Sequence, residues 1–340
     1  MTASVSAAAA GSAAAGQLLA GAGALPRIRL AVLPTPLVPA PRLAEALGLR
    51  SLLVKRDDLT GFAFGGNKAR LLEFLIAGAV ADGAGTLLTG GAPGSNFCAA
   101  TAAAARRAGL GCELVIAGIP GPSQSPALAL ARSWDATVRW TGTQDRDSVD
   151  TLLPVAAAEL TTQGRRPYLM PRGGATALGA VGYALAAAEL HEQLGGRRDV
   201  TVVVPTGSGG TLAGLVAGHR LLGRPWTLAG CSASRPPQAV ARQVLTLASQ
   251  CLRLLGTDDE PGPGDITIAD ARGPGHGMPS LAGRAAAAEA MRTEGLMLDP
   301  VYTAKALALA PPGRDVVFWH TGGVLDAVAK AQDTKAGERS

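Results

Sequence analysis

Short, strongly apolar runs alternate along this chain with longer stretches whose apolar residues recur at helical spacing. Residues 200–204 read VTVVV, which is typical of a strand buried inside a parallel sheet. After Gly66 the apolar positions follow the period of a helix instead: Leu71, Leu72, Phe74, Leu75 and Val80. This alternation of strand and helix with short connections predicts an α/β fold with mostly parallel sheets.

The predicted strands cover most of the chain at regular intervals: 51–55, 86–89, 112–117, 137–141, 168–171, 200–204, 227–232, 266–269 and 315–319. The predicted helices lie between them: 41–48, from 68 onward, 96–108, 125–133, 148–163, 177–194 and from 212 onward. In folds of this kind a ligand binds at the carboxyl ends of the strands, where loops lead into helices.

Composition argues against several classes of protein. Of 340 residues 47% are hydrophobic and 17% charged, so the chain is long and apolar enough for a large core. The net charge is +5, but only 4% of residues are aromatic and no basic stripe is interleaved with them, which argues against nucleic-acid binding. Residues 1–25 are uncharged and rich in Ala, Gly and Ser, which predicts a flexible or loosely helical extension rather than a signal peptide or membrane span.

The thiols and imidazoles show no pattern of their own. The cysteines are Cys98, Cys112, Cys231 and Cys251, and the histidines are His191, His219, His276 and His320. Neither set has metal-ligand spacing or a disulfide pattern. We therefore expect no metal, and reduced thiols as in a cytoplasmic protein.

Lys68 stands out because lysine is rare in this chain and because of its position. Only five of the 31 basic residues are lysines, and this one follows Gly65-Gly66-Asn67 at a predicted helix start, with Asn67 as the N-cap. A cation is disfavoured there, and the same field together with burial would lower the pKa of the amine and make it a better nucleophile. A lysine, unlike an arginine, can form a Schiff base with an aldehyde. The alternative is a surface lysine that follows a turn.

A glycine-rich loop, Pro205–Thr211, joins the most apolar strand to the next helix. Its glycines let several backbone N–H groups converge on a phosphate, the helix dipole adds to the attraction, and Ser208 and Thr211 offer hydroxyls. It is not a Walker loop, because no Gly-Lys-Ser/Thr follows, and the sixth position from Gly207 is Leu212, which breaks the dinucleotide pattern. We predict a phosphate site here, with a plain tight turn as the alternative.

Two further strand ends carry polar residues. In the loop 90–96, free N–H groups at a helix start suit a carboxylate, and Ser95 and Asn96 add a hydroxyl and an amide, although N-capping alone would explain both. In the segment 319–323, Thr321 can hydrogen-bond a heterocyclic nitrogen or simply cap a helix.

One ligand would use all of these groups. It would offer an aldehyde to the amine, a phosphate to the glycine loop and a ring nitrogen to Thr321, and it would hold a substrate carboxylate near Ser95. Pyridoxal 5′-phosphate with an amino acid meets these requirements. Tyr302, at another helix start, is by ordinary expectation a core residue.

Six motifs carry a resemblance to a known family: Lys55-Arg56-Asp57-Asp58, Gly65-Gly66-Asn67-Lys68, Gly91 with Ser95-Asn96, Gly207-Ser208-Gly209-Gly210-Thr211, Asp299-Pro300-Val301-Tyr302-Thr303 and His320-Thr321-Gly322-Gly323. Over roughly residues 30–330 the sequence resembles the D-cysteine desulfhydrase and 1-aminocyclopropane-1-carboxylate deaminase group of fold-type-II pyridoxal-phosphate enzymes. The resemblance implies a tryptophan synthase β-like fold of two open parallel-sheet α/β domains with the cofactor between them. It also implies a large domain of residues 26–70 plus 179–340, a small domain of residues 71–178, and a homodimer.

The resemblance also implies roles for single residues. Lys68 matches the Schiff-base lysine, and Ser95 and Asn96 match the loop that meets the substrate carboxylate and the 3′-oxygen of the cofactor. Tyr302 matches a tyrosine near the cofactor ring, and Thr321 matches the partner of the pyridine nitrogen. The cofactor phosphate is expected at Thr206, Gly207, Ser208, Gly209, Gly210 and Thr211.

The chain departs from the family at four positions. The cyclopropane deaminases have Glu at the position of Thr303 and Leu at that of Thr321, which places this chain nearer the desulfhydrase branch. His276 occupies a position where relatives have an active-site tyrosine, and it is either an acid for the leaving group or a passive substitute. Phe97 stands where relatives often have a polar residue that meets the substrate.

The expected reaction is α,β-elimination of a small amino acid such as cysteine, giving a 2-oxo acid, ammonia and the leaving group. The amine of Lys68 is the expected base for the α-proton. Ser95, Tyr302 and His276 are the other expected catalytic residues. The alternatives are β-replacement by an added nucleophile, ring-opening deamination of the cyclopropane type, and a ligand-binding homologue without activity.

Overall fold

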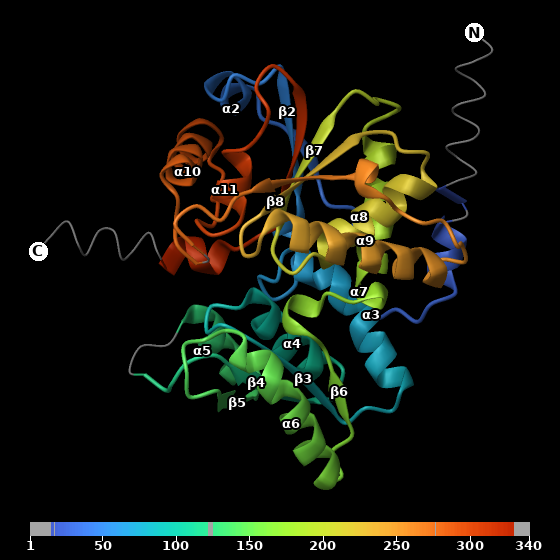
Figure 1. The fold of residues 1–340 in the computed structure, drawn as a ribbon, viewed down its shortest axis with the longest axis vertical. Helices are drawn as coiled ribbons and strands as arrows, with labels where there is room; N and C mark the ends of the chain where they lie inside the picture. The colour runs from blue at the N-terminus through green and yellow to red at the C-terminus, as the bar shows by residue number, and fades with distance from the viewer. Residues whose placement is uncertain (1–14, 17, 122–124, 276, 330–340) are drawn as a thin grey trace, which may run out of the picture.

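The computed structural model describes residues 15, 16, 18–121, 125–275 and 277–329. These residues form two sheets with helices packed around them, and the larger sheet lies above the smaller one in Figure 1. The larger sheet contains β1 (Leu37–Pro39), β2 (Ser51–Arg56), β7 (Thr201–Thr206), β8 (Thr227–Ser232), β9 (Thr267–Asp270) and β10 (Asp315–His320). The smaller sheet contains β3 (Thr86–Gly91), β4 (Gly111–Ile116), β5 (Thr137–Trp140) and β6 (Pro167–Leu169).

The helices follow the strands in chain order: α2 (Pro41–Ala46), α3 (Asn67–Ala81), α4 (Asn96–Arg107), α5 (Pro126–Ser133), α6 (Ser148–Thr162), α7 (Ala177–Gln193), α8 (Gly210–Leu221), α9 (Pro237–Leu254), α10 (Leu281–Glu294) and α11 (Thr303–Leu307). Short 3₁₀ turns are η1 (Asp57–Leu59), η2 (Arg172–Gly174) and η3 (Pro263–Asp265). The nine predicted strands are confirmed to within two residues at either end. Helices α9 and α10 are additional to the predicted elements.

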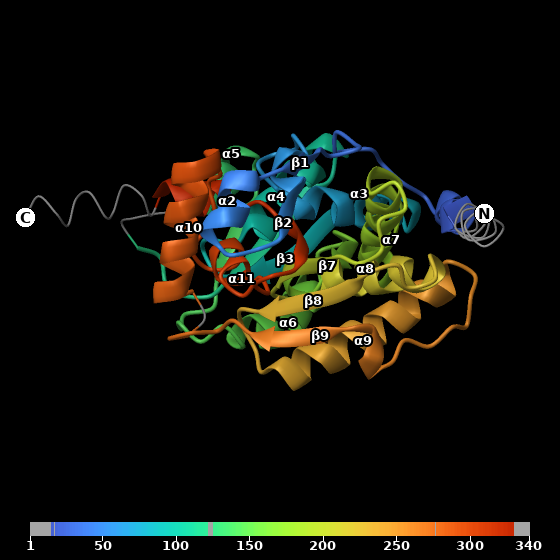
Figure 2. The same ribbon diagram turned by 90° about the horizontal axis from the view of Figure 1, so that it is seen from above.

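The sheets have the topology of an α/β protein. The strand order is β1-β2-β10-β7-β8-β9 in the larger sheet and β5-β4-β3-β6 in the smaller one. Among the described strands, every pair is parallel except β1 with β2. Seen from above in Figure 2, β9 and α9 lie together at one edge of the molecule.

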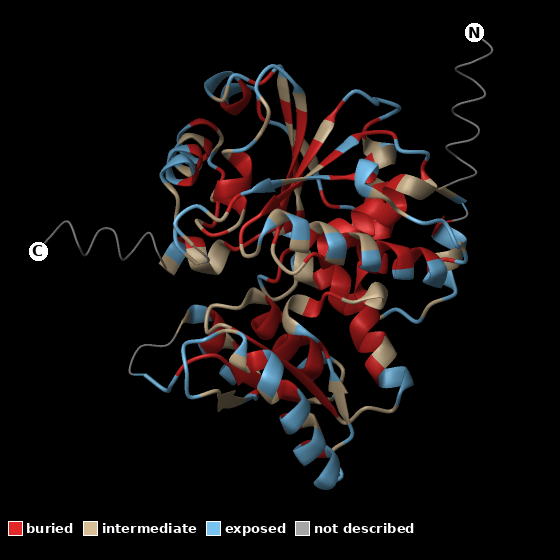
Figure 3. Cartoon of the chain, in the orientation of Figure 1, coloured by how far each residue is buried: buried red, intermediate tan, exposed pale blue. Residues whose placement is uncertain are grey.

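The central strands of the larger sheet are buried on both faces, as their apolar sequences predict. Val202, Val204 and Trp319 pack on one side with residues of α7 and α8, while Val203 and Phe318 pack on the other side with residues of α10 and α11. Figure 3 shows the buried residues concentrated on these strands and on the helix faces that cover them. The sheet therefore offers rigid strand ends to the loops that follow β2, β7 and β10.

The described part of the predicted N-terminal extension packs against the core. Residues 15, 16 and 18–23 are helical, Leu18 is fully buried, and a Cβ at Gly21 would lie 2.6 Å from the carbonyl oxygen of Leu255. The extension predicted for residues 1–14 and 17 falls outside the described residues. Within the described ranges, the structure contains no helix long and apolar enough to cross a membrane.

Candidate active site

The helix that carries Lys68 begins where two loops touch. Gly66 is the N-cap of α3, with φ 54°, and a Cβ there would lie 2.2 Å from the carbonyl oxygen of Thr321, so the contact requires glycine. Asn67 donates its backbone N–H to the same Thr321 oxygen at 2.9 Å. The prediction of Asn67 as N-cap is wrong, because its side chain is used elsewhere: Nδ2 donates to Thr211 Oγ1 at 2.9 Å. The lysine loop is thus tied to the loops after β10 and β7.

Lys68 lines a pocket together with the glycine-rich loop. The lining residues are Asn67, Lys68, Pro205, Thr206, Gly207, Ser208, Gly209, Thr211 and Leu212. Burial lowers the pKa of the Lys68 amine from 10.5 to about 8, and within the described part of the chain no carboxylate or hydrogen-bond acceptor meets its Nζ. The Nζ atom lies 6.0 Å from the centroid of the Phe97 ring. The amine is therefore available as a nucleophile or base near neutral pH.

The glycine-rich loop presents its amides to this pocket. Arg235 donates to the carbonyl oxygens of Gly207 at 3.5 Å and Ser208 at 3.4 Å. In a trans peptide the N–H points opposite to the C=O, so these bonds turn the following N–H groups away from Arg235. Gly209 has φ 97°, a conformation that favours glycine, and a Cβ at Gly207 would lie 3.0 Å from the ring of Tyr302. This geometry suits an anion at the start of α8.

The remaining members of the predicted phosphate loop have structural contacts. Thr206 is buried and its hydroxyl donates to the carbonyl oxygen of Val204 at 3.0 Å. Gly210 begins α8, and a Cβ there would lie 3.1 Å from the Cα of Ala175. The hydroxyl of Thr211 accepts from Asn67 and so connects this loop to the lysine loop.

Ser95 and Asn96 lie at the start of α4, just before Phe97, whose ring faces Lys68. Ser95 is the N-cap and its Oγ accepts from the N–H of Cys98 at 3.2 Å, so the capping interpretation is confirmed. Asn96 Oδ1 is buried without a hydrogen-bond partner among the described residues. The ring of Phe97 is buried, and a Cβ at Gly174 would lie 2.5 Å from it. Because buried polar atoms are normally hydrogen-bonded, the unpaired oxygen of Asn96 indicates that a bound ligand supplies the donor.

Tyr302 is held against the glycine-rich loop by the turn before α11. The carboxylate of Asp299 accepts backbone N–H groups from Val301, Tyr302 and Thr303, at 3.0, 2.7 and 2.9 Å. The hydroxyl of Thr303 also donates to Asp299, so it is turned away from the pocket. Burial raises the pKa of Tyr302 to about 12, which keeps its phenol protonated. A Cβ at Gly323 would lie 2.6 Å from Asp299, so this turn also meets the loop that contains Thr321.

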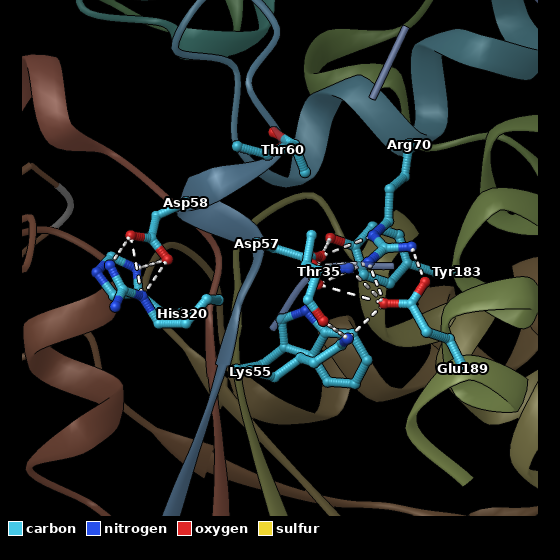
Figure 4. A network of polar contacts seen from close by, with 12 residues as sticks. Thr35, Lys55, Asp57, Asp58, Thr60, Arg70, Tyr183, Glu189 and His320 are labelled. Atoms are coloured by element: carbon cyan, nitrogen blue, oxygen red, sulfur yellow. Dashed lines mark hydrogen bonds and ion pairs between the residues drawn. The ribbon is translucent and has the colours of Figure 1, made fainter. Parts of the chain in front are cut away.

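Beneath the start of α3 lies a buried network of charges (Figure 4). Asp57 accepts two bonds from Arg70, at 2.9 and 3.0 Å, and Arg70 also donates to Glu189 at 2.9 and 3.0 Å. Lys55 donates to Glu189, and Tyr183 donates to Asp57. Burial alone would raise the pKa of Asp57, but the charge and hydrogen bonds of Arg70 outweigh it and the pKa is lowered. The network clamps α3 two residues after Lys68 to β2 and α7.

A second, smaller cluster of polar side chains lies on the other side of β2 (Figure 4). Asp58 binds Arg56 at 2.7 Å, and His320 Nδ1 lies 3.9 Å from Asp58. His320 Nε2 is 3.0 Å from the carbonyl oxygen of Met297. Burial lowers the pKa of His320, so the imidazole is neutral and shapes the loop before Thr321.

Sequence patterns missed several of these residues. Local signatures of a site are lacking at Arg70, Glu189, Tyr183 and Arg235. The charged run Lys55-Arg56-Asp57-Asp58 is one of the family motifs, but it did not predict the network. His276 falls outside the described residues. The part of the chain that the structure describes contains no group of three or more His, Cys, Asp or Glu side chains that could hold a metal ion.

Comparisons with known proteins agree with this geometry. The family model described as pyridoxal-phosphate dependent enzyme matches residues 28–322. A D-cysteine desulfhydrase of Yersinia enterocolitica is 39% identical over 315 residues, which is 88% of this chain and 94% of that protein. A D-cysteine desulfhydrase of Klebsiella pneumoniae is 38% identical, with the same coverage.

Solved structures confirm the fold. A homologue of 1-aminocyclopropane-1-carboxylate (ACC) deaminase matches with a TM-score of 0.86 and 30% identity, covering 94% of this chain and 98% of its own. An L-serine ammonia-lyase from Rhizomucor miehei matches with a TM-score of 0.65 and 20% identity, covering 90% of this chain and 98% of its own, which shows a shared fold alone. The predicted fold type II is therefore confirmed.

The residues present fit the expected cofactor. A partly buried amine with a lowered pKa, a cradle of glycine amides and an unpaired amide oxygen lie around one site. They are the partners that an aldehyde, a phosphate and a hydroxyl group require. The chain belongs to the family of pyridoxal-phosphate-dependent enzymes, it has fold type II, and its cofactor is pyridoxal 5′-phosphate.

Proposed function

We propose that this chain is a lyase that removes the α-proton and the β-substituent of a small amino acid. Water then converts the unsaturated product into a 2-oxo acid and ammonia. The similarity to D-cysteine desulfhydrases over 88% of the chain supports this choice of reaction. With cysteine as the substrate, the sulfur leaves as sulfide.

The roles of the residues follow from the chemistry that each can supply. When bound, pyridoxal phosphate withdraws electrons from the α-carbon and makes its proton acidic. Lys68, with a pKa of about 8, would bind the cofactor aldehyde, and once the amino group of the substrate has displaced it, its freed amine would accept the α-proton. The N–H groups at the start of α4, with Ser95 and Asn96, bind the substrate carboxylate.

The remaining groups complete the proposed site. The loop from Thr206 to Thr211 holds the phosphate. Thr321 meets the ring nitrogen, and as a neutral group it does not stabilise a protonated pyridine, which favours loss of a β-substituent. Tyr302, protonated because burial raises its pKa to about 12, is the proposed donor to the leaving group. For His276, which falls outside the described residues, the same role is a prediction from the sequence.

A second candidate is ring-opening deamination of ACC. The ACC deaminase homologue, at 30% identity and a TM-score of 0.86, favours it. The hydroxyl of Thr303 argues against it, because this side chain is bonded to Asp299 and the cyclopropane deaminases are expected to have a glutamate here. β-Replacement and a non-catalytic role remain further alternatives.

The test begins with the absorption spectrum of the purified protein. We expect a cofactor band that shifts in Lys68→Ala and in Lys68→Arg, where the second variant keeps the charge but cannot bind the aldehyde covalently. D- and L-cysteine, β-chloroalanine, O-acetylserine and ACC are then assayed for 2-oxo acid and ammonia. Elimination from β-substituted substrates with no turnover of ACC supports the proposal, while turnover of ACC alone refutes it. An added thiol that diverts the product from the 2-oxo acid would indicate β-replacement.

We also propose a cytoplasmic homodimer, as the resemblance and the cysteine content predict. Large apolar side chains near the lysine loop support a protein contact, since Val32 is 69% and Phe64 61% exposed. Light scattering that gives the mass of a single chain would contradict the dimer.

A further inference from the structure

Two guanidinium groups beside the pocket have no carboxylate partner among the described residues. Arg146 lies just before α6, and its Nε is buried without a hydrogen-bond partner. Arg235 follows β8, and its guanidinium meets only neutral acceptors: Gln243 and the carbonyl oxygens of Gly207 and Ser208. Both residues are half-buried. A charge that is partly removed from water is unfavourable unless opposite charge compensates it, so these two groups indicate an anion that binds between them.

Contacts place the segment of Arg146 against the glycine-rich loop. Arg172 donates to the carbonyl oxygen of Arg146 at 2.9 Å and is neutralised by Asp147 and Asp150. The next residue, Gly173, lies so close to Ser208 that a Cβ would be 2.6 Å from its Oγ. The segment after β6, which binds the backbone of Arg146, therefore contacts the glycine-rich loop after β7.

The electrostatics agree with this arrangement. Burial raises the pKa of Tyr302, and the positive charge of Arg146 opposes that rise, which places the guanidinium near the ring. Burial lowers the pKa of Arg235, and the charges of Arg172 and Arg146 lower it further, against a smaller opposing effect of Asp150. Arg146 thus lies near both Arg235 and Tyr302, and these last two both contact Gly207 of the glycine-rich loop.

The anions of the proposed reaction already have sites made of backbone amides. The substrate carboxylate has the start of α4, and the cofactor phosphate has the loop before α8. The positive charge of Arg146 and Arg235 is additional to both. A third acidic group, on the far side of the substrate, would use it.

We propose that Arg146, with Arg235 beside it, binds an oxyanion on the β-substituent of the substrate, so that the enzyme accepts amino acids with an acidic leaving group. A carboxylate, sulfonate or phosphate has the matching chemistry, since guanidinium groups bind such groups through paired hydrogen bonds. This specificity rests on the elimination reaction proposed above. The other source of the same chemistry is the phosphate of the cofactor.

The test compares substrates that differ in the charge of the leaving group. For the holoenzyme and Arg146→Gln, kcat/KM is measured with O-phosphoserine and O-acetylserine, and the dissociation constant of pyridoxal phosphate is measured by absorbance. We expect kcat/KM for O-phosphoserine, divided by kcat/KM for O-acetylserine, to fall about tenfold or more in Arg146→Gln. Such a loss is typical of a charged hydrogen bond. Arg253→Gln, which removes an exposed arginine on α9, is the matched control and should leave the ratio unchanged. Circular dichroism checks that both variants are folded.

Other outcomes overturn the proposal. If Arg146→Gln weakens cofactor binding but keeps the ratio, the anion is the cofactor phosphate. If it changes neither, Arg146 binds no oxyanion.

If the wild type eliminates none of these compounds, the proposed function fails, and calorimetry with aspartate and alanine decides the site separately. A tighter binding of aspartate that is lost in Arg146→Gln supports the oxyanion site without the reaction. Equal binding of the two amino acids refutes it.

Discussion

Replacing Asp57 by Asn removes the charge at the centre of the buried network while keeping its shape. Arg70 donates to this carboxylate at 2.9 and 3.0 Å, Trp319 at 2.8 Å and Thr35 at 2.7 Å. In the variant, the buried guanidinium of Arg70 keeps only Glu189 as an acidic partner. Removing one partner of a buried ion pair costs about 3–5 kcal/mol, because the other charge is left uncompensated. Such a loss is a large part of a total stability of about 5–15 kcal/mol.

Urea unfolding followed by circular dichroism measures this loss, with pyridoxal phosphate saturating in every sample. Asp135→Asn is the control, because this aspartate pairs with Arg106 at the surface, where both side chains are about 70% exposed, and should cost less than about 1 kcal/mol. The double variant with Arg70→Met should lose less than the sum of the two single changes. A cost below about 1 kcal/mol for Asp57→Asn, or additivity in the double variant, would refute the buried-pair interpretation.

The stability that the Asp57 carboxylate contributes should depend on pH. Since the folded pKa of Asp57 is lowered, its stabilising effect is complete above the unfolded pKa of about 3.9 and is lost as the pH falls through the folded value. The difference between wild type and Asp57→Asn should therefore be constant near neutral pH and shrink below about pH 4. A difference that grows on acidification would contradict the sign of the shift.

Three further predictions concern the pocket. The rate at which apoenzyme combines with pyridoxal phosphate, followed by absorbance, should rise with pH around the Lys68 pKa of about 8, because the free amine is the nucleophile. A rise centred near pH 10.5 would contradict the lowering of this pKa by burial. Gly66→Ala places a Cβ 2.2 Å from the carbonyl oxygen of Thr321, in a residue with φ 54°, so the cofactor band should be weak or absent. Gly48→Ala is the control for backbone strain alone, because Gly48 has φ 64° and a Cβ there meets no atom within 4 Å. Arg235→Gln releases the carbonyl oxygens of Gly207 and Ser208, and equilibrium titration should show about tenfold weaker cofactor binding, with unchanged affinity counting against this role.

The strands and the loops of the site were predictable because their signals are local. A VTVVV strand followed by a glycine-rich turn, and a lysine after Gly65-Gly66-Asn67, are each visible within about ten residues. Helix α9 also has a local signal, because its buried residues recur at helical spacing from Val240 to Leu252, so the pattern was sufficient to predict it.

The network and the arginines were not predictable in the same way. Arg70 and Glu189 are 119 residues apart and meet only because α3 and α7 pack together. Asn67 has the residue type of an N-cap, but Thr211 competes for its side chain and Gly66 takes the cap position. Residue type at a helix start therefore indicates a site less reliably than the tertiary contacts that surround it.

The lowered pKa of Lys68 comes from burial that no counter-charge offsets. Asp57 and Asp58 both bind arginines, and Asp299 accepts three backbone N–H groups, so none of these acids forms an ion pair with the amine. An ion pair would stabilise the ammonium form and raise the pKa, which would oppose both attack on the cofactor and removal of a proton. Each of these three acids thus has another partner, and none of them offsets the burial of the amine. Burial of Lys68 then acts without a counter-charge, and this accounts for a pKa near 8 at a position where spacing alone could not distinguish a catalytic lysine from a surface one.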